Sequence, residues 1–170
     1  WTVIYYTIYF YFFKEIKELE AAGIKTKGNL FIAENTHIIT KAHKAEDKEN
    51  GGKIGTTSRG IGPVYSDVRA RRALLVGDVL LPDFKQKEAS LSEFHTNILN
   101  MYKDKYGFEI NLEKINEAKE KWNNALKELQ KLKICDLSSL IQRKLSEGKN
   151  ILAEGAQAVM LDIDFGDYPN

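Results

Sequence analysis

The stretch from Lys53 to Asp78 reads KIGTTSRGIGPVYSDVRARRALLVGD, and the interpretation of the whole chain depends on it. Its first part, Gly55 to Ser58, consists of small or hydroxylated residues, and Arg59 and Gly60 follow directly. Such residues can direct backbone N–H groups, hydroxyls and a guanidinium toward one point, which complements the oxygens of a phosphate. The stretch therefore predicts a phosphate-binding loop.

Three arginines, Arg69, Arg71 and Arg72, follow the Gly62-Pro63 pair. Because Gly-Pro interrupts regular structure, we expect these arginines in the first turns of a new helix. They could be solvated side chains of an ordinary turn and helix, or they could bind phosphate. The adjacent GTTSRGIGP sequence favours phosphate binding. A nucleic-acid interface has less support, because no aromatic platform accompanies the arginines.

The composition is that of a soluble globular protein. Of the 170 residues, 43% are hydrophobic and 29% are charged, and the net charge is +1. This length suffices for one ordinary domain, and the balanced charge argues against nucleic-acid and membrane partners. The single cysteine, Cys135, excludes an internal disulfide and fits a reducing compartment. The histidines His37, His43 and His95 lack metal-ligand spacing, so we predict no structural zinc. We expect His43 on the surface, and His37 at a helix start or in packing.

A second polar block, Glu154 to Gln157, follows a predicted buried strand at Asn150 to Ala153. Ligands of α/β sheets bind at the carboxyl ends of strands, which makes this block a candidate binding loop. Asp162 and Asp164 lie further along the chain, two residues apart and without a third ligand nearby. That pattern favours structural carboxylates over a metal site.

Two segments closely resemble the adenylosuccinate synthetase family: IGTTSRGIGPVY with RARRALLVGD, and ILAEGAQAVMLDIDFGDYP at Ile151 to Pro169. Both segments have the family's order and about its spacing, and the resemblance extends from Lys14 to Asn170. Family members are longer and begin with a Gly-rich, Asp-containing loop that this sequence lacks, which implies an internal fragment. The implied fold is α/β, a partial mixed sheet with a helical insertion of about three helices. Its parent fold is P-loop-NTPase-like.

The resemblance implies that the first segment binds IMP. By position, Thr57 would hydrogen-bond the 5′-phosphate, and Thr56 and the Gly55 backbone would line the same loop. Arg59 and Gly60 would support that loop.

Two further IMP contacts are implied. Arg71 corresponds to the arginine that reaches the phosphate site of the partner subunit, which implies a homodimer with shared sites. Gln157 corresponds to a glutamine near the base, where an amide offers both a donor and an acceptor. Four positions depart from the family pattern: Ser58, Val68, Ala158 and Asp167. Ser58 replaces a glycine, so a positive φ at this position would be strained.

The implied reaction is the GTP-dependent ligation of IMP and L-aspartate in cytoplasmic AMP synthesis. GTP phosphorylates the 6-oxygen of IMP, and the aspartate amino group then displaces phosphate. The Mg²⁺ and GTP ligands and the catalytic acid and base correspond to no residue of this sequence, so we predict no catalytic residue here and no activity of the isolated chain. The alternatives are a non-catalytic phosphate- or nucleotide-binding module and an inert truncated fragment.

We expect one partial domain. Its predicted parts are a divergent apolar segment (1–13), a sheet and helix part with the implied IMP-binding segment (14–82), a helical subdomain (83–149), and a strand followed by the loop Glu154 to Gln157 (150–170).

The predicted strands are the apolar segment through Phe13 and the stretch from Asn29 to Glu34. The predicted helices are Lys14 to Ala22, a helix capped by Asn35 or Thr36, Asp83 to Lys105, Asn111 to Lys133, and Asp136 to Gly148.

Overall fold

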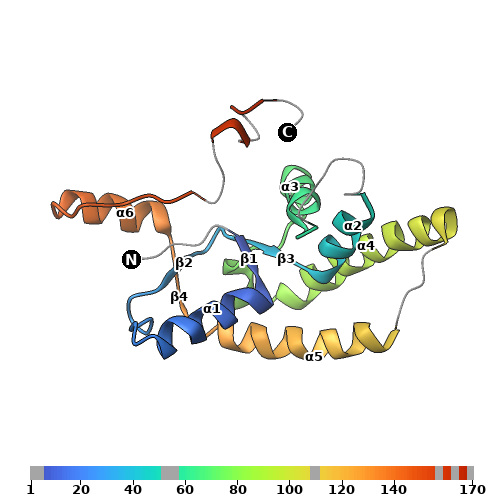
Figure 1. Cartoon of the computed structure of the whole chain (residues 1–170), viewed down its shortest axis with the longest axis horizontal. Helices are drawn as coiled ribbons and strands as arrows, with labels where there is room; N and C mark the ends of the chain where they lie inside the picture. The colour runs from blue at the N-terminus through green and yellow to red at the C-terminus, as the bar shows by residue number, and fades with distance from the viewer. Residues whose placement is uncertain (1–5, 51–57, 108–111, 156–158, 162–164, 168–170) are drawn as a thin grey trace. The chain divides into compact units, whose positions relative to one another are not determined.

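The computed structural model describes residues 6–50, 58–107, 112–155, 159–161 and 165–167. The chain divides into two compact units, Trp1–Leu137 and Ser138–Asn170. The first unit holds all the strands of the described residues, and five helices surround them (Figure 1). The second unit holds nearly all of α6 (Leu137–Ser146) and the short 3₁₀ helix η3 (Val159–Leu161).

Two parallel strand pairs form the sheet structure of the first unit. Strand β1 (Tyr6–Ile8) pairs with β3 (His37–Ile39), and β2 (Phe31–Ala33) pairs with β4 (Lys133–Cys135). One isolated antiparallel bridge joins His37 to Leu75. Ile32, Ala33, Ile38 and Ile39 are buried, as expected for short parallel strands that are covered on both faces. The α/β class predicted from the sequence is thus confirmed.

Helices account for most of the remaining chain. Their bounds in the first unit are α1 (Tyr9–Ala21), α2 (Lys41–Asn50), α3 (Ile61–Arg69), the 3₁₀ helix η2 (Gly77–Leu80), α4 (Phe84–Tyr106) and α5 (Leu112–Leu129). The helix predicted from Asp83 to Lys105 agrees closely with α4, and the helix predicted from Asp136 to Gly148 agrees closely with α6. The predicted helix through Lys133 ends earlier, at Leu129, because the chain turns over the next three residues and enters β4 at Lys133, beside β2.

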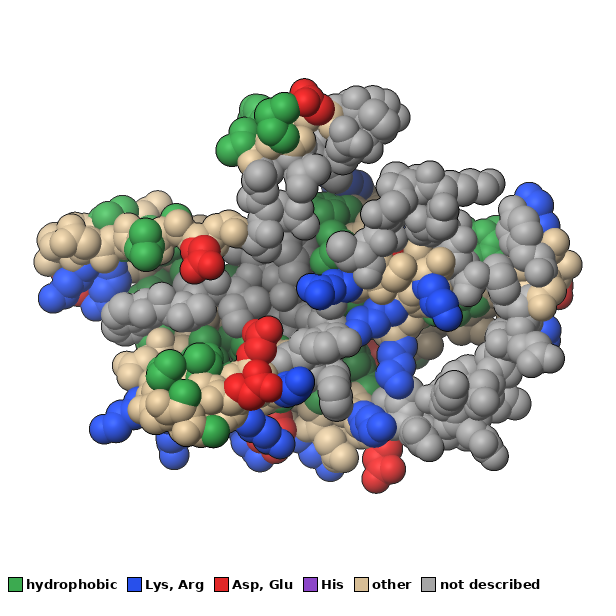
Figure 2. Space-filling view, viewed as in Figure 1, with side chains coloured by type: hydrophobic (Ala, Val, Ile, Leu, Met, Phe, Trp, Pro, Cys, Tyr) green, Lys and Arg blue, Asp and Glu red, His purple; other side chains and the backbone are tan. Residues whose placement is uncertain are grey.

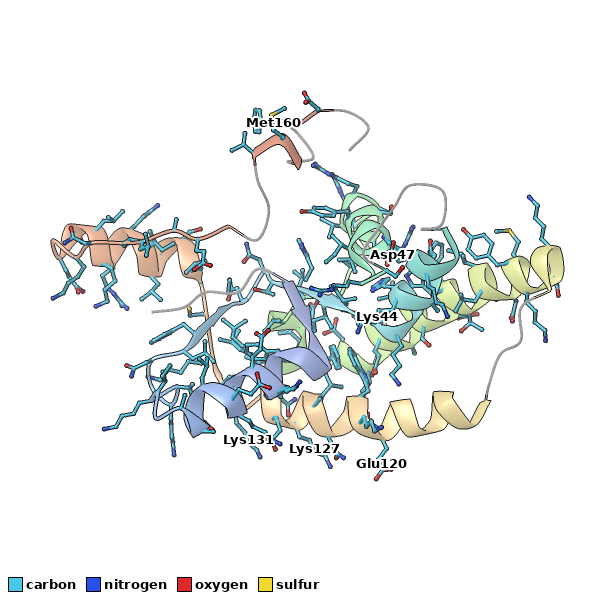
Figure 3. The ribbon with its side chains drawn as sticks, viewed as in Figure 1. Lys44, Asp47, Glu120, Lys127, Lys131 and Met160 are labelled. Carbon is cyan, nitrogen blue, oxygen red and sulfur yellow. The ribbon has the colours of Figure 1, made fainter. Side chains whose placement is uncertain are left out.

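One hydrophobic core holds the first unit together. It is built from Phe12, Ile32, Ile38, Leu74, Val76, Val79, Phe84, Leu91, Leu126 and Leu129. Helix α1 packs against α5, and α2 packs against both α3 and α4. The opposite side of α5 and the turn after it is polar, where Glu120, Lys127 and Lys131 point away from the core (Figure 3). Figure 2 shows Lys and Arg atoms interspersed with Asp and Glu atoms, in keeping with the net charge of +1.

The N-terminal apolar segment is not a strand along its whole length. Among its described residues, which start at Tyr6, the extended part is Tyr6–Ile8, and α1 begins at Tyr9. The helix places Phe12 in the core with Ile16, one turn later, packed against it. A short apolar run does not distinguish strand from helix by its periodicity, so packing decided the structure.

The prediction of a helix directly after Asn35 or Thr36 was also wrong. Thr36 is fully buried, and its carbonyl accepts the backbone N–H of Val76 at 2.8 Å. Strand β3 follows, and α2 begins only at Lys41. The partner strand β1 lies far away in the sequence, so its contribution could not be seen locally.

The three arginines occupy the end of a helix rather than its beginning. Helix α3 starts at Ile61 and places Pro63 in its first turn. Proline is tolerated there because the first N–H groups of a helix have no intrahelical partner. Arg69 is therefore the last residue of α3, and Arg71 and Arg72 lie beyond it.

The predicted buried strand at Asn150 to Ala153 is absent. These residues have no regular secondary structure and are exposed, with Leu152 93% accessible. No strand among the described residues pairs with this segment. None of the described helices is both long and apolar enough to cross a bilayer.

Candidate functional site

The predicted phosphate-binding loop is described only at its end. Gly55, Thr56, Thr57 and Gln157 lie outside the described residues, so their predicted convergence stays a prediction. Ser58, Arg59, Gly60 and Arg71 are described.

Gly60 connects the loop to α3 and is fixed by α2. Its backbone N–H donates to the Asp47 carboxylate at 2.7 Å, and in Figure 3 Asp47 lies on α2 next to α3. Gly60 has φ +84°, and a Cβ atom there would come within 2.9 Å of Ile39 Cγ2 and 3.0 Å of the Lys44 backbone nitrogen. Both the conformation and the space therefore require glycine.

The residue at the loop end has the strain expected from the sequence. Ser58 has φ +52°, in the left-handed region that glycine adopts most readily. The departure from glycine at this position thus places a side chain in an unfavourable backbone conformation.

Cations gather beside the same loop end. Burial lowers the pKa of Lys44, and the neighbouring charges of Lys41 and Arg59 lower it further. Positive charge therefore accumulates at this end of the loop, which is one feature that an anion-binding site needs.

Arg71 lies in a strained turn at the carboxyl end of α3. Its φ is +60°, and its backbone N–H donates to the Val68 carbonyl at 3.0 Å. The next N–H, of Arg72, donates to the Asp67 carbonyl at 3.0 Å. This pair of bonds is a Schellman motif, whose left-handed position is usually glycine. Here that position is occupied by an exposed arginine.

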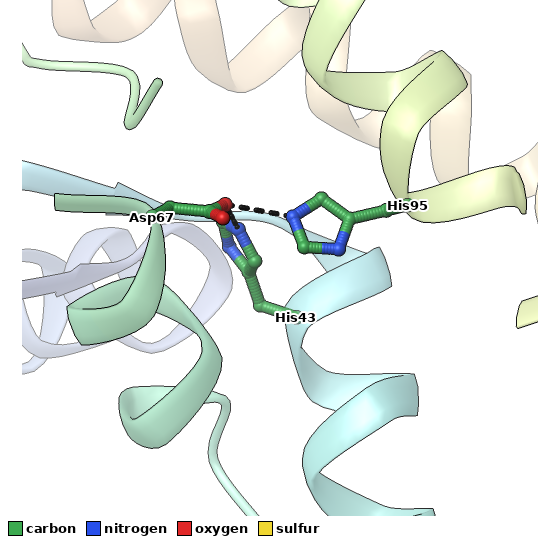
Figure 4. A group of neighbouring side chains, drawn as sticks. All are labelled: His43, Asp67 and His95. Carbon is green, nitrogen blue, oxygen red and sulfur yellow. Dashed lines mark hydrogen bonds and ion pairs between the residues drawn. The ribbon is translucent and has the colours of Figure 1, made fainter. Parts of the chain in front are cut away.

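A buried charged cluster lies beneath this turn, formed by Asp67 and the histidines His43 and His95 (Figure 4). Asp67 Oδ2 accepts from His43 Nε2 at 2.8 Å and from His95 Nε2 at 2.7 Å. Asp67 Oδ1 accepts from Arg72 Nε at 2.6 Å. The side chains of Asp67 and the two histidines are at most 2% exposed. The cluster joins α2, α3 and α4.

The hydrogen bonds assign the protons of both rings. His43 Nδ1 accepts the backbone N–H of Thr40 at 2.9 Å, so its proton lies on Nε2. His95 uses both nitrogens on carboxylates, with Nδ1 3.0 Å from Glu46 and Nε2 on Asp67. Both His95 nitrogens therefore act as donors.

The electrostatics agree with that assignment. Burial by itself would lower the pKa of His95, but hydrogen bonds to Asp67 and Glu46 outweigh it and raise the pKa to about 9. Burial would raise the pKa of Asp67, but hydrogen bonds from the two histidines and Arg72 hold it well below its ordinary value. The cluster is thus an ion network, with Asp67 negative and His95 and Arg72 positive.

The same cluster fits a bound metal ion poorly. The Nε2 atoms of His43 and His95 both donate protons to Asp67 and have no lone pair for an ion. Nitrogen–oxygen separations of 2.7 and 2.8 Å are also shorter than the about 3.3 Å between tetrahedral zinc ligands. Mg²⁺ prefers an all-oxygen site, which two imidazoles do not provide.

Sequence reasoning missed this cluster. The prediction that His43 lies on the surface was wrong, because His43 is fully buried. A signal was present in α4: His95 falls four residues after buried Leu91 and three before Ile98, on the inward stripe. Of the two alternatives predicted for His37, the helix start was wrong, because this residue lies in β3, where it is half-buried.

Comparison with known proteins places this geometry in a family. The family described as adenylosuccinate synthetase matches residues 7–170. The chain belongs to the adenylosuccinate synthetase family. It is similar to the adenylosuccinate synthetases of Cytophaga hutchinsonii, at 39% identity over 163 residues, and of Polynucleobacter necessarius, at 42% over 164 residues. These alignments cover 93% and 92% of the chain but only 36% and 35% of the two relatives.

A solved structure shows the same relationship in three dimensions. The fully ligated adenylosuccinate synthetase of Plasmodium falciparum matches with a TM-score of 0.71 and 32% identity, over 92% of this chain and 36% of that one. The chain thus spans about a third of the length of the adenylosuccinate synthetases it resembles. The fold and the family predicted from the two sequence blocks are confirmed.

Proposed function

We propose that this chain forms part of the IMP site of an adenylosuccinate synthetase. The whole enzyme would use GTP and Mg²⁺ to join IMP and L-aspartate in cytoplasmic AMP synthesis. Arg71 carries the proposal: an exposed arginine occupies a left-handed turn position where glycine would be less strained. Such strain costs on the order of 1 kcal/mol and is typical of residues that bind ligands.

In this proposal Thr57 binds the 5′-phosphate, with Thr56 and the Gly55 backbone in the same loop and Gln157 near the base. Arg71 contributes to the phosphate site of a second copy of the protein, so the functional unit is a homodimer. The Gly60–Asp47 hydrogen bond supports these roles, because it ties the end of the loop to the core through α2.

The residues described here supply binding rather than catalysis. The reaction would proceed through phosphorylation of the IMP 6-oxygen and displacement by the aspartate amino group. GTP and Mg²⁺ supply the phosphoryl transfer, and we assign no residue of this chain to them. We expect the isolated chain to form no adenylosuccinate from IMP, GTP and aspartate, and product formation by the purified chain would refute this.

IMP binding, measured by isothermal titration calorimetry, tests the proposal. Arg71→Leu and Thr57→Val should each weaken IMP binding about 10- to 100-fold, as expected for loss of a charged or loop hydrogen bond to phosphate. Arg143→Leu is a matched control, because Arg143 is 66% exposed on α6. Thr96→Val, on the exposed face of α4, is the control for threonine.

The alternatives predict other results. A non-catalytic nucleotide-binding module would also lose IMP affinity in Arg71→Leu. It would differ in activity: a full-length adenylosuccinate synthetase whose matching segment is replaced by this chain would form no adenylosuccinate. An inert fragment would bind neither IMP nor inosine. Equal IMP affinity in the wild-type chain and in Arg71→Leu would exclude the proposed role of Arg71.

A further inference from the structure

The neighbouring residues Arg71 and Arg72 are both exposed but differ in the contacts of their side chains. Arg71 is exposed at φ +60°, whereas Arg72 pairs with Asp67 and places its guanidinium 3.8 Å from the centre of the Phe94 ring. The first side chain is available to a ligand, and the second is bound to α3 and α4. Of these two adjacent arginines, Arg71 can therefore bind a ligand, whereas Arg72 stabilises the fold.

Two hydrogen bonds connect Arg72 to Asp67 and so enclose the left-handed turn at Arg71. Arg72 donates its backbone N–H to the Asp67 carbonyl at 3.0 Å and its Nε–H to the Asp67 carboxylate at 2.6 Å. These two bonds hold the residue after Arg71 against the last turn of α3. Arg71 therefore cannot relax to a negative φ without moving Arg72 away from Asp67.

Asp67 is itself immobilised by two other helices. His43 on α2 and His95 on α4 both donate to its Oδ2, and its side chain is 1% exposed. Phe94, beside His95, supports the Arg72 guanidinium through a cation–π contact. The Asp67 end of the pair is thus anchored in the packed interior, and the Arg72 end, whose side chain is 37% exposed, is held against Phe94 at the surface.

We infer that Asp67 is a positioning residue, which acts through Arg72 to hold the turn that presents Arg71 to the phosphate of a nucleotide. This inference rests on the proposed function of Arg71. The buried histidines complete the arrangement, because both bind Oδ2 of Asp67 and so direct Oδ1 toward Arg72. Asp67 touches no ligand in this inference.

Amide hydrogen exchange of the 170-residue chain tests the positioning step without any ligand. Arg72→Lys keeps the positive charge but loses the planar fork that bonds Asp67 and stacks on Phe94. We expect exchange at the Arg71 and Arg72 amides to accelerate at least about fivefold, with the β2 amides unchanged. Arg143→Lys, in the second unit, should alter neither. Asp67→Asn should act like Arg72→Lys where it folds, and unchanged exchange in Arg72→Lys overturns the inference.

A double-mutant cycle on IMP affinity tests the functional step. Arg72→Lys should weaken IMP binding about fivefold or more, and should add no further loss to Arg71→Gly. Inosine lacks the phosphate, so every variant that still binds inosine should bind it with the wild-type affinity. Equal loss of IMP affinity with and without Arg71 overturns the inference, because Arg72 would then act independently. If Arg71→Gly alone leaves IMP affinity unchanged, the proposed function of Arg71 fails, and the exchange data still decide whether Asp67 holds the turn.

Discussion

Asp67 and Arg72 are joined twice, by a side-chain ion pair at 2.6 Å and by a backbone hydrogen bond at 3.0 Å. The two bonds close a loop around Arg71, whose φ of +60° would otherwise be unfavourable for an arginine. The Asp67 side chain is 1% exposed and the Arg72 side chain 37%, so solvent screens this ion pair less than a pair that is exposed at both ends. The strain is therefore confined to Arg71, and tertiary contacts of its neighbours stabilise the left-handed conformation of this residue.

Replacing Arg71 with glycine should make the chain more stable and less able to bind IMP. Glycine relieves the left-handed strain, and we expect the free energy of unfolding to rise by about 0.5–1 kcal/mol. Urea denaturation measures this change. Arg143→Gly on α6 is the control, and should destabilise by about 1 kcal/mol because Arg143 is inside a helix. Destabilisation by Arg71→Gly would show that the turn does not strain the arginine.

Ser58→Gly should also stabilise the chain. Ser58 has φ +52° and is exposed, so glycine removes the strain of the left-handed conformation. We expect a gain of up to about 1 kcal/mol in the free energy of unfolding. Ser58→Ala retains the Cβ atom and should give no such gain, whereas equal stabilisation by both variants would attribute the effect to the hydroxyl.

Gly60→Ala should be the most damaging single change in the loop region. Its Cβ would lie 2.9 Å from Ile39 Cγ2 and close to the α2 backbone, at a φ of +84°. We expect a loss of about 2–4 kcal/mol, from overpacking and backbone strain together. Gly62→Ala is the matched control: its Cβ meets nothing within 4 Å inside α3, so it should be neutral or slightly stabilising. Thermal unfolding of both variants checks this, and a tolerated Gly60→Ala would contradict the described packing.

The stability of the chain should fall as the pH rises from about 6.5 to 9. The pKa of His95 is raised to about 9, so its stabilising contribution is complete below its unfolded pKa and disappears as the pH passes 9. The full effect is roughly 3 kcal/mol. Asp67 contributes in the opposite direction: its lowered pKa gives stability above about pH 4 that is lost on acidification. The groups facing His95 are Asp67 from α3 and Glu46 and His43 from α2.

Denaturation at a series of pH values measures this dependence. His95→Gln should flatten the slope between pH 6.5 and 9, because the amide does not titrate. His37→Gln is the control: burial lowers the pKa of His37, so that residue titrates below this interval. An unchanged slope in His95→Gln would show that His95 is not charged in the folded chain.

The sequence predicted several elements well, because their signals are local. Helices α4 and α6 follow from apolar residues at helical spacing and from residues that end helices, such as Gly107 and Gly148. The family followed from two blocks, and the strain at Ser58 followed from its replacement of a glycine. Pairing between distant segments was not predictable in the same way. Strand β3 was missed because its partners, β1 and Leu75, are about 30 or more residues away in the sequence.

By itself, the sequence determined the α/β class and the family, since both depend on residue identity and short spacing, and the phosphate-binding residues stay a prediction. Only the tertiary structure decided that His43, Asp67 and His95 meet, that Arg72 is structural and that Arg71 is exposed. The physical reason is that a buried charge is stable only where partners from other elements compensate it. Those partners lie 24 and 28 residues from Asp67 along the chain, so only folding brings them within hydrogen-bonding distance.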